Sequence, residues 1–251
     1  MTPLTRPVIR NEILLVLGVS LGASALHSVL DIINRLTLVV RLSEQTATIN
    51  NSVTPGRPWL DLSYQLLRAV VLVVPALLAL HLLHRDRTDA FASIGLDRQR
   101  PWFDLGTGAG LAAVIGLPGL GLYLAAREFG INTVVAPANL SEAWWNLPVL
   151  ILLAAGNGFL EEIVVVAYLT TRLRDLGCRT AQVVAASALL RGSYHLYQGF
   201  GGFVGNAIMG VVFALFFLRT RRIIPLVIAH TLLDVVAFVG YTLLRDHVSW
   251  L

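Results

Sequence analysis

The stretch that decides the fold is LPVLILLAAGNGFLEEIVVVAYLT, residues 147–170. Its length and apolar character predict a membrane-spanning helix, because about 20 apolar residues cross the hydrocarbon layer of a bilayer. Two adjacent carboxylates, Glu161 and Glu162, interrupt this run, and Asn157 is its only other strongly polar residue. Ionisable groups inside a bilayer are costly unless they are paired or solvated. The stretch therefore predicts both a membrane helix and a functional position within it.

The composition extends this prediction to the whole chain. Hydrophobic residues make up 56% of the 251 residues and charged residues 14%, and the mean hydropathy is +0.72. Soluble domains have about 45–50% apolar and about 25% charged residues. We therefore predict an all-α fold, a polytopic transmembrane helix bundle of about seven to eight spans. The candidate spans are residues 12–33, 60–83, 103–125, 147–170, 180–197, 203–218 and 223–244. We divide the chain into N-terminal spans and loops, residues 1–145, and a core, residues 146–245, packed as one membrane domain.

Basic residues predict the orientation of the bundle. All 19 are arginine, and they are dispersed among apolar runs, which argues against a nucleic-acid partner. Twelve of them flank the predicted spans on the side of the N-terminus, and five lie on the opposite side. The positive-inside rule then predicts a multi-pass protein of the inner (plasma) membrane, with a cytoplasmic N-terminus and an external polar loop at 34–58. Arginine without lysine is typical of a GC-rich, bacterial source.

Ionisable side chains inside the predicted spans are the candidate functional residues. We interpret His27 and Asp31 as hydrogen-bonded packing residues, and Arg68 as half of a structural ion pair, with Asp31 as a candidate partner. The C-terminal half carries a denser set of polar residues, which are Glu161, Glu162, Arg191, His195, Asn206, His230 and Asp234. Three helices with costly groups at comparable depth indicate a site.

The spacing within this set points to acid–base chemistry. Adjacent residues on a helix point about 100° apart, so one glutamate can line a cavity while the other faces a neighbouring helix. Arg191 and His195 are four residues apart and share a helix face, and so are His230 and Asp234. A buried carboxylate can act as a general base, and histidine can orient a water molecule or donate to an oxyanion.

Other chemistries have weaker sequence support. Two histidines and a glutamate could hold zinc, but no His-Glu-x-x-His signature occurs. We expect no metal and no cofactor, with zinc as the alternative. The single cysteine, Cys178, excludes an intramolecular disulfide and a cysteine-based zinc cage. Glycines 199, 201 and 202 predict a tight turn, and the glycines within 106–121 predict close helix packing.

The order of these motifs resembles a known family. Glu161-Glu162 is followed by Arg191-Gly-Ser-Tyr-His195, then by Gly205-Asn206, then by His230-x-x-x-Asp234. This is similar to the CAAX protease and bacteriocin-processing (CPBP/Abi) family of intramembrane proteases, which includes the CAAX prenyl protease 2-like branch. The resemblance covers about residues 147–240.

The resemblance implies hydrolysis of a peptide bond in a membrane-embedded or lipidated protein or peptide. Glu161 matches the water-activating glutamate, Glu162 the glutamate that supports the site, and His195 the histidine that positions the water. His230 and Asp234 match the pair that stabilises the oxyanion, and Asn206 matches a polar position of the preceding helix. In prenyl-protein processing the reaction removes the last three residues after a lipidated cysteine, and the implied mechanism needs no metal.

Two positions depart from the family pattern. The arginine of Glu-Glu-x-x-x-Arg is replaced by Val166, and the phenylalanine of Phe-x-x-x-His is replaced by Arg191. We hypothesise that Arg191 reaches Glu162 and supplies the missing positive charge. A third difference concerns Asp234, because an ionised aspartate cannot donate to an oxyanion. It must be protonated or must orient His230.

Two alternatives to a protease stay open. The departures at Val166 and Arg191 also fit a catalytically silent family member that binds or scaffolds a membrane partner. Intramembrane histidine, aspartate and glutamate are also found in proton relays, so a small ion-coupled transporter is the third hypothesis. Such transporters usually contain an internal repeat, and this chain shows none.

Overall fold

The computed structural model describes residues 4–87, 89–140, 143–245 and 247–248. The main helices, in chain order, are α1 (Arg6–Gly18), α2 (Leu21–Leu36), α3 (Pro58–Asp86), α4 (Ala90–Ser93), α5 (Pro101–Glu128), α6 (Asn146–Glu161), α7 (Leu169–Asp175), α8 (Thr180–Tyr194), α9 (Phe200–Thr220) and α10 (Ile224–Leu244). The shorter elements are the 3-10 turns η1 (Leu42–Glu44) and η3 (Leu196–Gln198), the π-helix η2 (Glu162–Tyr168), and the strands β1 (Thr46–Asn51) and β2 (Val134–Asn139). The expected all-helical membrane bundle is confirmed, with the addition of one small sheet.

The number of helices long enough to cross a bilayer is smaller than expected. Within the described residues, five helices qualify by length and composition, and the bent pair α1–α2, with a 53° angle, makes up to six. The segment at 180–197, expected to span, forms only the 15-residue helix α8. Its length of about 22 Å is short of the roughly 30 Å hydrocarbon layer. The chain leaves the helix after Tyr194 and turns through η3, so the fifth expected span is not a helix of spanning length.

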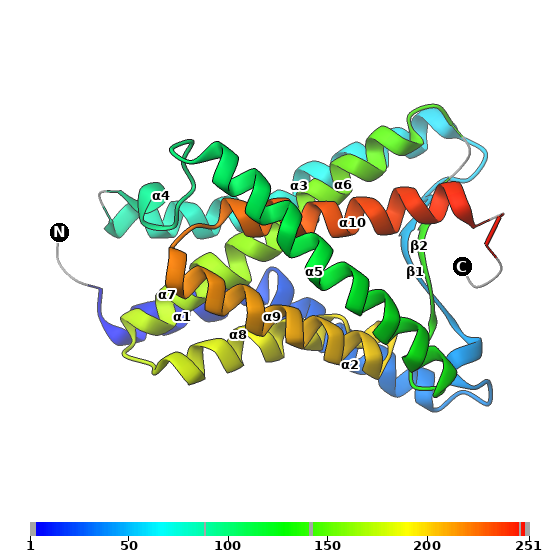
Figure 1. Cartoon of the computed structure of the whole chain (residues 1–251), viewed down its shortest axis with the longest axis horizontal. Coiled ribbons are helices and arrows are strands. Elements are labelled where there is room, and N and C mark those ends of the chain that lie inside the picture. Colours follow the sequence, from blue (N-terminus) through cyan, green and yellow to red (C-terminus); the bar gives the residue numbers. More distant parts are fainter. Residues whose placement is uncertain (1–3, 88, 141–142, 246, 249–251) are drawn as a thin grey trace.

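The continuous helix α6–η2–α7 forms the centre of the bundle. Buried residues make up 72% of its most apolar window, compared with 6% for α5. All seven residues of η2 are buried. Helix α5 instead lies at the outside of the bundle, against α10 and α9 (Figure 1). Residues 147–170 therefore form the core around which the other helices pack.

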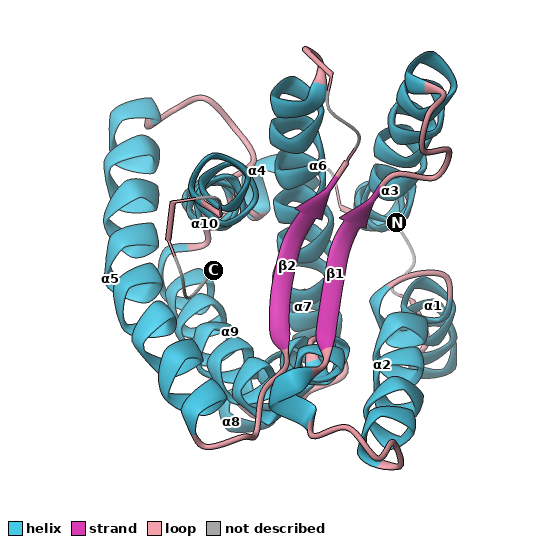
Figure 2. Cartoon of the chain, turned by 90° about the vertical axis from the view of Figure 1, so that its right-hand side faces the viewer, coloured by secondary structure: helices cyan, strands magenta, loops and turns pink. Residues whose placement is uncertain are grey.

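A parallel two-stranded sheet closes one end of the bundle. Strand β1 comes from the expected external loop 34–58 and pairs with β2, which lies 88 residues later in register (Thr46 with Val134, Asn51 with Asn139). Figure 2 shows the two strands side by side between the helices. These strands were not predicted, because polar residues such as those of Thr46–Asn51 read as loop when their partner strand is unknown. Their pairing places the α2–α3 and α5–α6 connections at the same end.

The opposite end carries the arginine-rich connections. The start of α1, the helix α4, and the α7–α8 and α9–α10 connections lie at the left of Figure 1, whereas the sheet lies at the right. A buried guanidinium holds this end together: Arg172 bonds to Asp86 at 2.6 Å and to Glu12 at 3.3 Å. It thereby joins α7 to α3 and α1. The end opposite the sheet thus carries more arginines than the sheet end, as the sequence predicts.

Some of the expected glycine contacts are present. A Cβ atom at Gly108 or Gly116 of α5 would lie within 3.0 Å of a side chain of α10. A Cβ atom at Gly158 of α6 would lie 2.8 Å from Thr231 Oγ1 of α10. The glycines at 106, 110, 119 and 121 have open space instead. Gly199 forms the expected turn before α9, and its φ of 115° favours glycine.

Candidate active site

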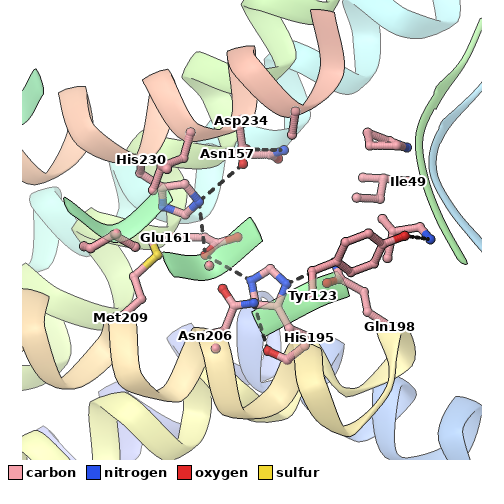
Figure 3. A pocket seen from close by; sticks show the side chains of 18 of the residues that line it. Ile49, Tyr123, Asn157, Glu161, His195, Gln198, Asn206, Met209, His230 and Asp234 are labelled. Atoms are coloured by element: carbon pink, nitrogen blue, oxygen red, sulfur yellow. Dashed lines mark hydrogen bonds and ion pairs between the residues drawn. The ribbon is translucent and has the colours of Figure 1, made fainter. Parts of the chain in front are cut away.

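A cavity of about 700 Å³ lies between the helices and beneath the sheet. Five of the candidate residues line it, namely Glu161, His195, Asn206, His230 and Asp234. They come from four different parts of the chain: α6, the end of α8, α9 and α10. Figure 3 shows Glu161, His195, His230 and Asp234 pointing toward one another in the cavity. The helices therefore bring together side chains that lie up to 73 positions apart in the sequence.

The two adjacent glutamates have different surroundings. Glu161 lines the cavity, and 11% of its side chain is accessible, whereas the Glu162 side chain is fully buried on the other side of the helix. The change from α-helix to π-helix falls between these two residues. Short π segments are often found at functional sites. As the angular spacing predicts, one carboxylate faces the cavity and the other faces neighbouring helices.

Glu162 forms the buried support of the site. Arg191 Nη2 donates to Glu162 Oε1 at 2.6 Å, which is the contact that the hypothesis for the displaced arginine requires. His230 Nδ1 lies 2.7 Å from the same oxygen. Because a carboxylate paired with arginine is ionised and only accepts, Nδ1 must be the donor. The Nε2 atom of His230 is therefore the one that faces the cavity.

Glu161 Oε2 is the atom on which the site converges. Tyr194 donates to it through its hydroxyl group at 2.6 Å. Nε2 of His195 and Nε2 of His230 each lie 3.8 Å away from it, and Arg191 Nη1 lies 3.5 Å away. This carboxylate is thus surrounded by one hydroxyl group, two imidazoles and one guanidinium.

His195 caps the C-terminal end of α8 rather than lying within a helix. Among the described residues its buried Nε2 atom has no hydrogen-bond partner, while Nδ1 lies 3.4 Å from Gln198 Nε2. Because Gln198 Nε2 is a donor, Nδ1 accepts in this pair. The proton of a neutral His195 is then on Nε2, which points toward Glu161.

Asp234 lies on the wall of the cavity opposite His195 (Figure 3). Its Oδ1 atom is 3.8 Å from His230 Nε2, and Asn157 Nδ2 donates to its Oδ2 atom at 3.4 Å. Asn157 and Glu161 are four residues apart and both line the cavity. Asn206 also lines the cavity, but its amide group donates to Gly202 O of its own helix at 3.0 Å.

Sequence reasoning missed two side chains of this site. Tyr194 makes the shortest contact to Glu161, yet a tyrosine in an apolar helix carries no signal of its own. Asn157 was noted only as a polar interruption, although its spacing of four from Glu161 could have placed it on the same face. Neither residue was among the candidates.

The three polar residues predicted within the N-terminal spans, His27, Asp31 and Arg68, do not contact one another. His27 is exposed and bonds to Ala23 O of its own helix at 3.0 Å, and Asp31 pairs with Arg35 at 3.9 Å. The suggested partnership of Asp31 with Arg68 is therefore wrong, because Asp31 pairs along its own helix. Arg68 lines the cavity instead.

In the described part of the chain, no group of three or more His, Cys, Asp or Glu residues could hold a metal ion.

The fold and the site together define a polytopic helical membrane protein with a carboxylate–histidine centre in an internal cavity. Residues 143–236 match the family model described as type II CAAX prenyl endopeptidase Rce1-like. This match contains every one of the candidate site residues, and it confirms the resemblance to the CPBP/CAAX protease family over that segment. No curated protein and no solved structure matches the chain.

Proposed function

We propose that this protein is an intramembrane endopeptidase that hydrolyses a peptide bond in a membrane-embedded or lipidated protein or peptide. The observation that carries the proposal is the convergence on Glu161 Oε2, which lines the cavity between Tyr194, His195 and His230. The family match supports the same class of reaction, because the model describes an endopeptidase. The proposed location is the inner membrane, with the arginine-rich end in the cytoplasm.

Glu161 acts as the general base in this proposal. Its Oε2 atom and His195 Nε2 are 3.8 Å apart, which is too long for a direct hydrogen bond and allows one water molecule to bond to both. Glu161 takes a proton from that water as the water oxygen attacks the peptide carbonyl carbon. The proton then passes to the leaving nitrogen as the carbon–nitrogen bond breaks. Tyr194 holds the carboxylate in place during both steps.

His230 and Asp234 stabilise the oxyanion as a pair. Nδ1 of His230 donates to Glu162, and Nε2 lies 3.8 Å from both Glu161 and Asp234. Because Nδ1 donates to Glu162, donation from Nε2 to a developing oxyanion uses the imidazolium form of His230. Asp234 then orients His230 without donating itself. Asn157, next to Asp234, contributes a neutral amide donor to the same wall.

The test compares protein ends in membranes from cells with the wild type, Glu161→Gln or no copy of the protein. New termini should appear only with the wild type, because the amide cannot accept the proton; loss of a general base costs about 10²–10⁴-fold in rate. The sequence at the new ends would identify the substrate. Identical termini in wild-type and Glu161→Gln cells would contradict the proposal.

Two alternatives give different outcomes in the same experiment. A silent binding protein would keep its biological effect in the Glu161→Gln variant. A zinc-dependent enzyme would lose cleavage on chelation and recover it on addition of zinc. We expect cleavage that depends on Glu161 and persists in the presence of a chelator.

A further inference from the structure

An arginine without an acidic partner lines the cavity. Arg68 lies within the apolar span α3 and is exposed in the isolated chain. Its one described hydrogen bond is a 3.5 Å contact from Nη2 to Ile49 O of β1. No carboxylate of the described residues lies within ion-pair distance, 4.0 Å, of its guanidinium. A cation at this depth is costly and is normally paired.

The buried arginines of the described residues all form ion pairs. Arg172 contacts Glu12 and Asp86, Arg191 contacts both glutamates of the site, and Arg222 contacts Asp97 and Asp104. Each of these guanidinium groups contacts at least two carboxylates. Arg68 has no such partner among the described residues, and its position in the cavity wall makes it accessible to a ligand.

The position of Arg68 relative to Glu161 follows from helix packing. A Cβ atom on Gly156 would lie 2.9 Å from Leu72 Cδ2, so Leu72 is level with Gly156. Helices α3 and α6 run in the same direction from the sheet end (Figure 1). Arg68 is one turn before Leu72, which places it level with about residue 152, nine residues or about 14 Å before Glu161. An extended peptide covers this distance with roughly four residues.

We infer that Arg68 is a specificity-determining residue that binds a carboxylate of the substrate peptide, a few residues beyond the bond that is cut. This inference rests on the proposed function, because it assigns a role in peptide binding to a residue of the same cavity. Guanidinium groups bind carboxylates through paired hydrogen bonds, and the apolar cavity wall strengthens that contact. The carboxylate is either the C-terminus of the peptide or an acidic side chain, and the two sources can be separated by experiment.

The test uses the full-length protein in detergent micelles and three forms of one peptide with an S-farnesylated cysteine as its fourth residue from the end. The forms are the free acid, the C-terminal amide, and an amide with glutamate as the last residue. The wild type should cleave the free acid with at least a tenfold higher kcat/KM than the amide. Cleavage of the glutamate form at the rate of the acid would identify an acidic side chain as an equally good ligand.

Variants at Arg68 separate binding from catalysis. Arg68→Gln should raise KM for the free acid to the value for the amide and leave kcat unchanged, because the contact is remote from the reacting atoms. Arg68→Lys should retain part of the preference for the acid. Arg41→Gln is the matched control, since Arg41 is exposed and does not line the cavity; it should keep the full preference.

Binding of uncleaved peptide gives a second measurement. In the Glu161→Gln background, the free acid should bind more tightly than the amide, and Arg68→Gln should remove the difference. If the free acid and the amide bound with equal affinity, the role of Arg68 would be overturned. The same conclusion would follow if neither form bound at concentrations up to millimolar. Loss of bound anionic phospholipid rather than of peptide affinity in Arg68→Gln would overturn it as well. The proposed function fails separately, when wild-type and Glu161→Gln membranes have the same protein ends.

Discussion

At the scale of single residues, Arg191 supplies a buried carboxylate with a positive charge from another helix. The family pattern places an arginine four residues after the second glutamate, where this chain has Val166 in the fully buried π-helix. Arg191 approaches Glu162 from α8 instead, and its guanidinium also lies 5.4 Å from the ring of Phe213. In this chain an arginine of α8 thus pairs with Glu162, as the compensation hypothesis requires.

Removal of this charge should destabilise the protein. Arg191→Leu removes the arginine partner of the buried Glu162 and leaves it only the hydrogen bond from His230; breaking a buried ion pair in this way costs about 3–5 kcal/mol. We expect a clear decrease in the melting temperature of the protein in detergent, together with loss of cleavage. The compensation hypothesis would be wrong if Arg191→Leu left folding and activity intact while Val166→Arg abolished both.

At the scale of helices, the site depends on the close approach of α6 and α10. Gly158 lies one turn from Glu161, and its missing side chain lets Thr231 of α10 pack against the backbone of α6. This contact sets the distance between Glu161 on one helix and His230 on the other. A larger residue must push the two helices apart.

A methyl group at this position should therefore be harmful. In Gly158→Ala the added Cβ would lie 2.8 Å from Thr231 Oγ1 and 3.0 Å from its backbone nitrogen. Overpacking of this kind costs about 1–3 kcal/mol, and activity should fall with stability. Gly110→Ala is the matched control, because its Cβ meets nothing within 4 Å and alanine favours a helix by about 0.5–1 kcal/mol. Equal melting temperatures for the two variants would contradict this account of the α6–α10 contact.

The connection between α4 and α5 predicts a response to pH. The backbone N–H of Gln99 and the guanidinium of Arg222 both donate to Asp97 and lower the pKa of its carboxyl group below the ordinary 3.8. A lowered folded-state pKa stabilises the fold above pH 3.8, and this contribution is lost as the pH falls through the lower value. Asp97 is partly exposed, so the effect is at most about 1 kcal/mol.

The change Asp97→Asn should reveal this contribution. The variant should melt below the wild type at pH 6, and the difference should shrink as the pH falls from 4 to 3. Thermal unfolding in detergent across this range measures it. A difference that grows on acidification would mean that Asp97 does not stabilise the fold through its charge.

At the scale of the whole molecule, the two ends of the bundle differ in charge and in structure. One end carries the arginine-rich connections and the Arg172 network, and the other carries the parallel sheet above the cavity. The positive-inside rule predicts that the first end lies in the cytoplasm. The site is then reached from within the bilayer or from the side of the sheet.

The single cysteine provides a test of this orientation. Cys178 lies in the α7–α8 connection at the arginine-rich end and is partly accessible. A membrane-impermeant maleimide should label it in inverted vesicles and not in intact cells. For the opposite end, Val53, which is 55% exposed, can be changed to cysteine in a Cys178→Ser background. This variant should be labelled in intact cells, and the reverse pattern would contradict the predicted orientation.

The sequence by itself determined the membrane class, the charge asymmetry of the ends and five of the polar residues that line the cavity. It could do so because hydropathy and the spacing of four residues on a helix are local properties of the chain. His230 and Asp234, for example, share a face whatever lies opposite them.

Only the tertiary structure decided which of these side chains meet. The pairing of β1 with β2, the bond from Tyr194 to Glu161 and the position of Arg68 in the cavity all join segments far apart in the sequence. The length of α8 was overestimated because its turn into η3 depends on contacts with the α5–β2 connection, such as Phe200 N to Ile131 O at 2.9 Å. Such contacts depend on how each helix is rotated and how closely it packs, and neighbouring residues alone do not specify that.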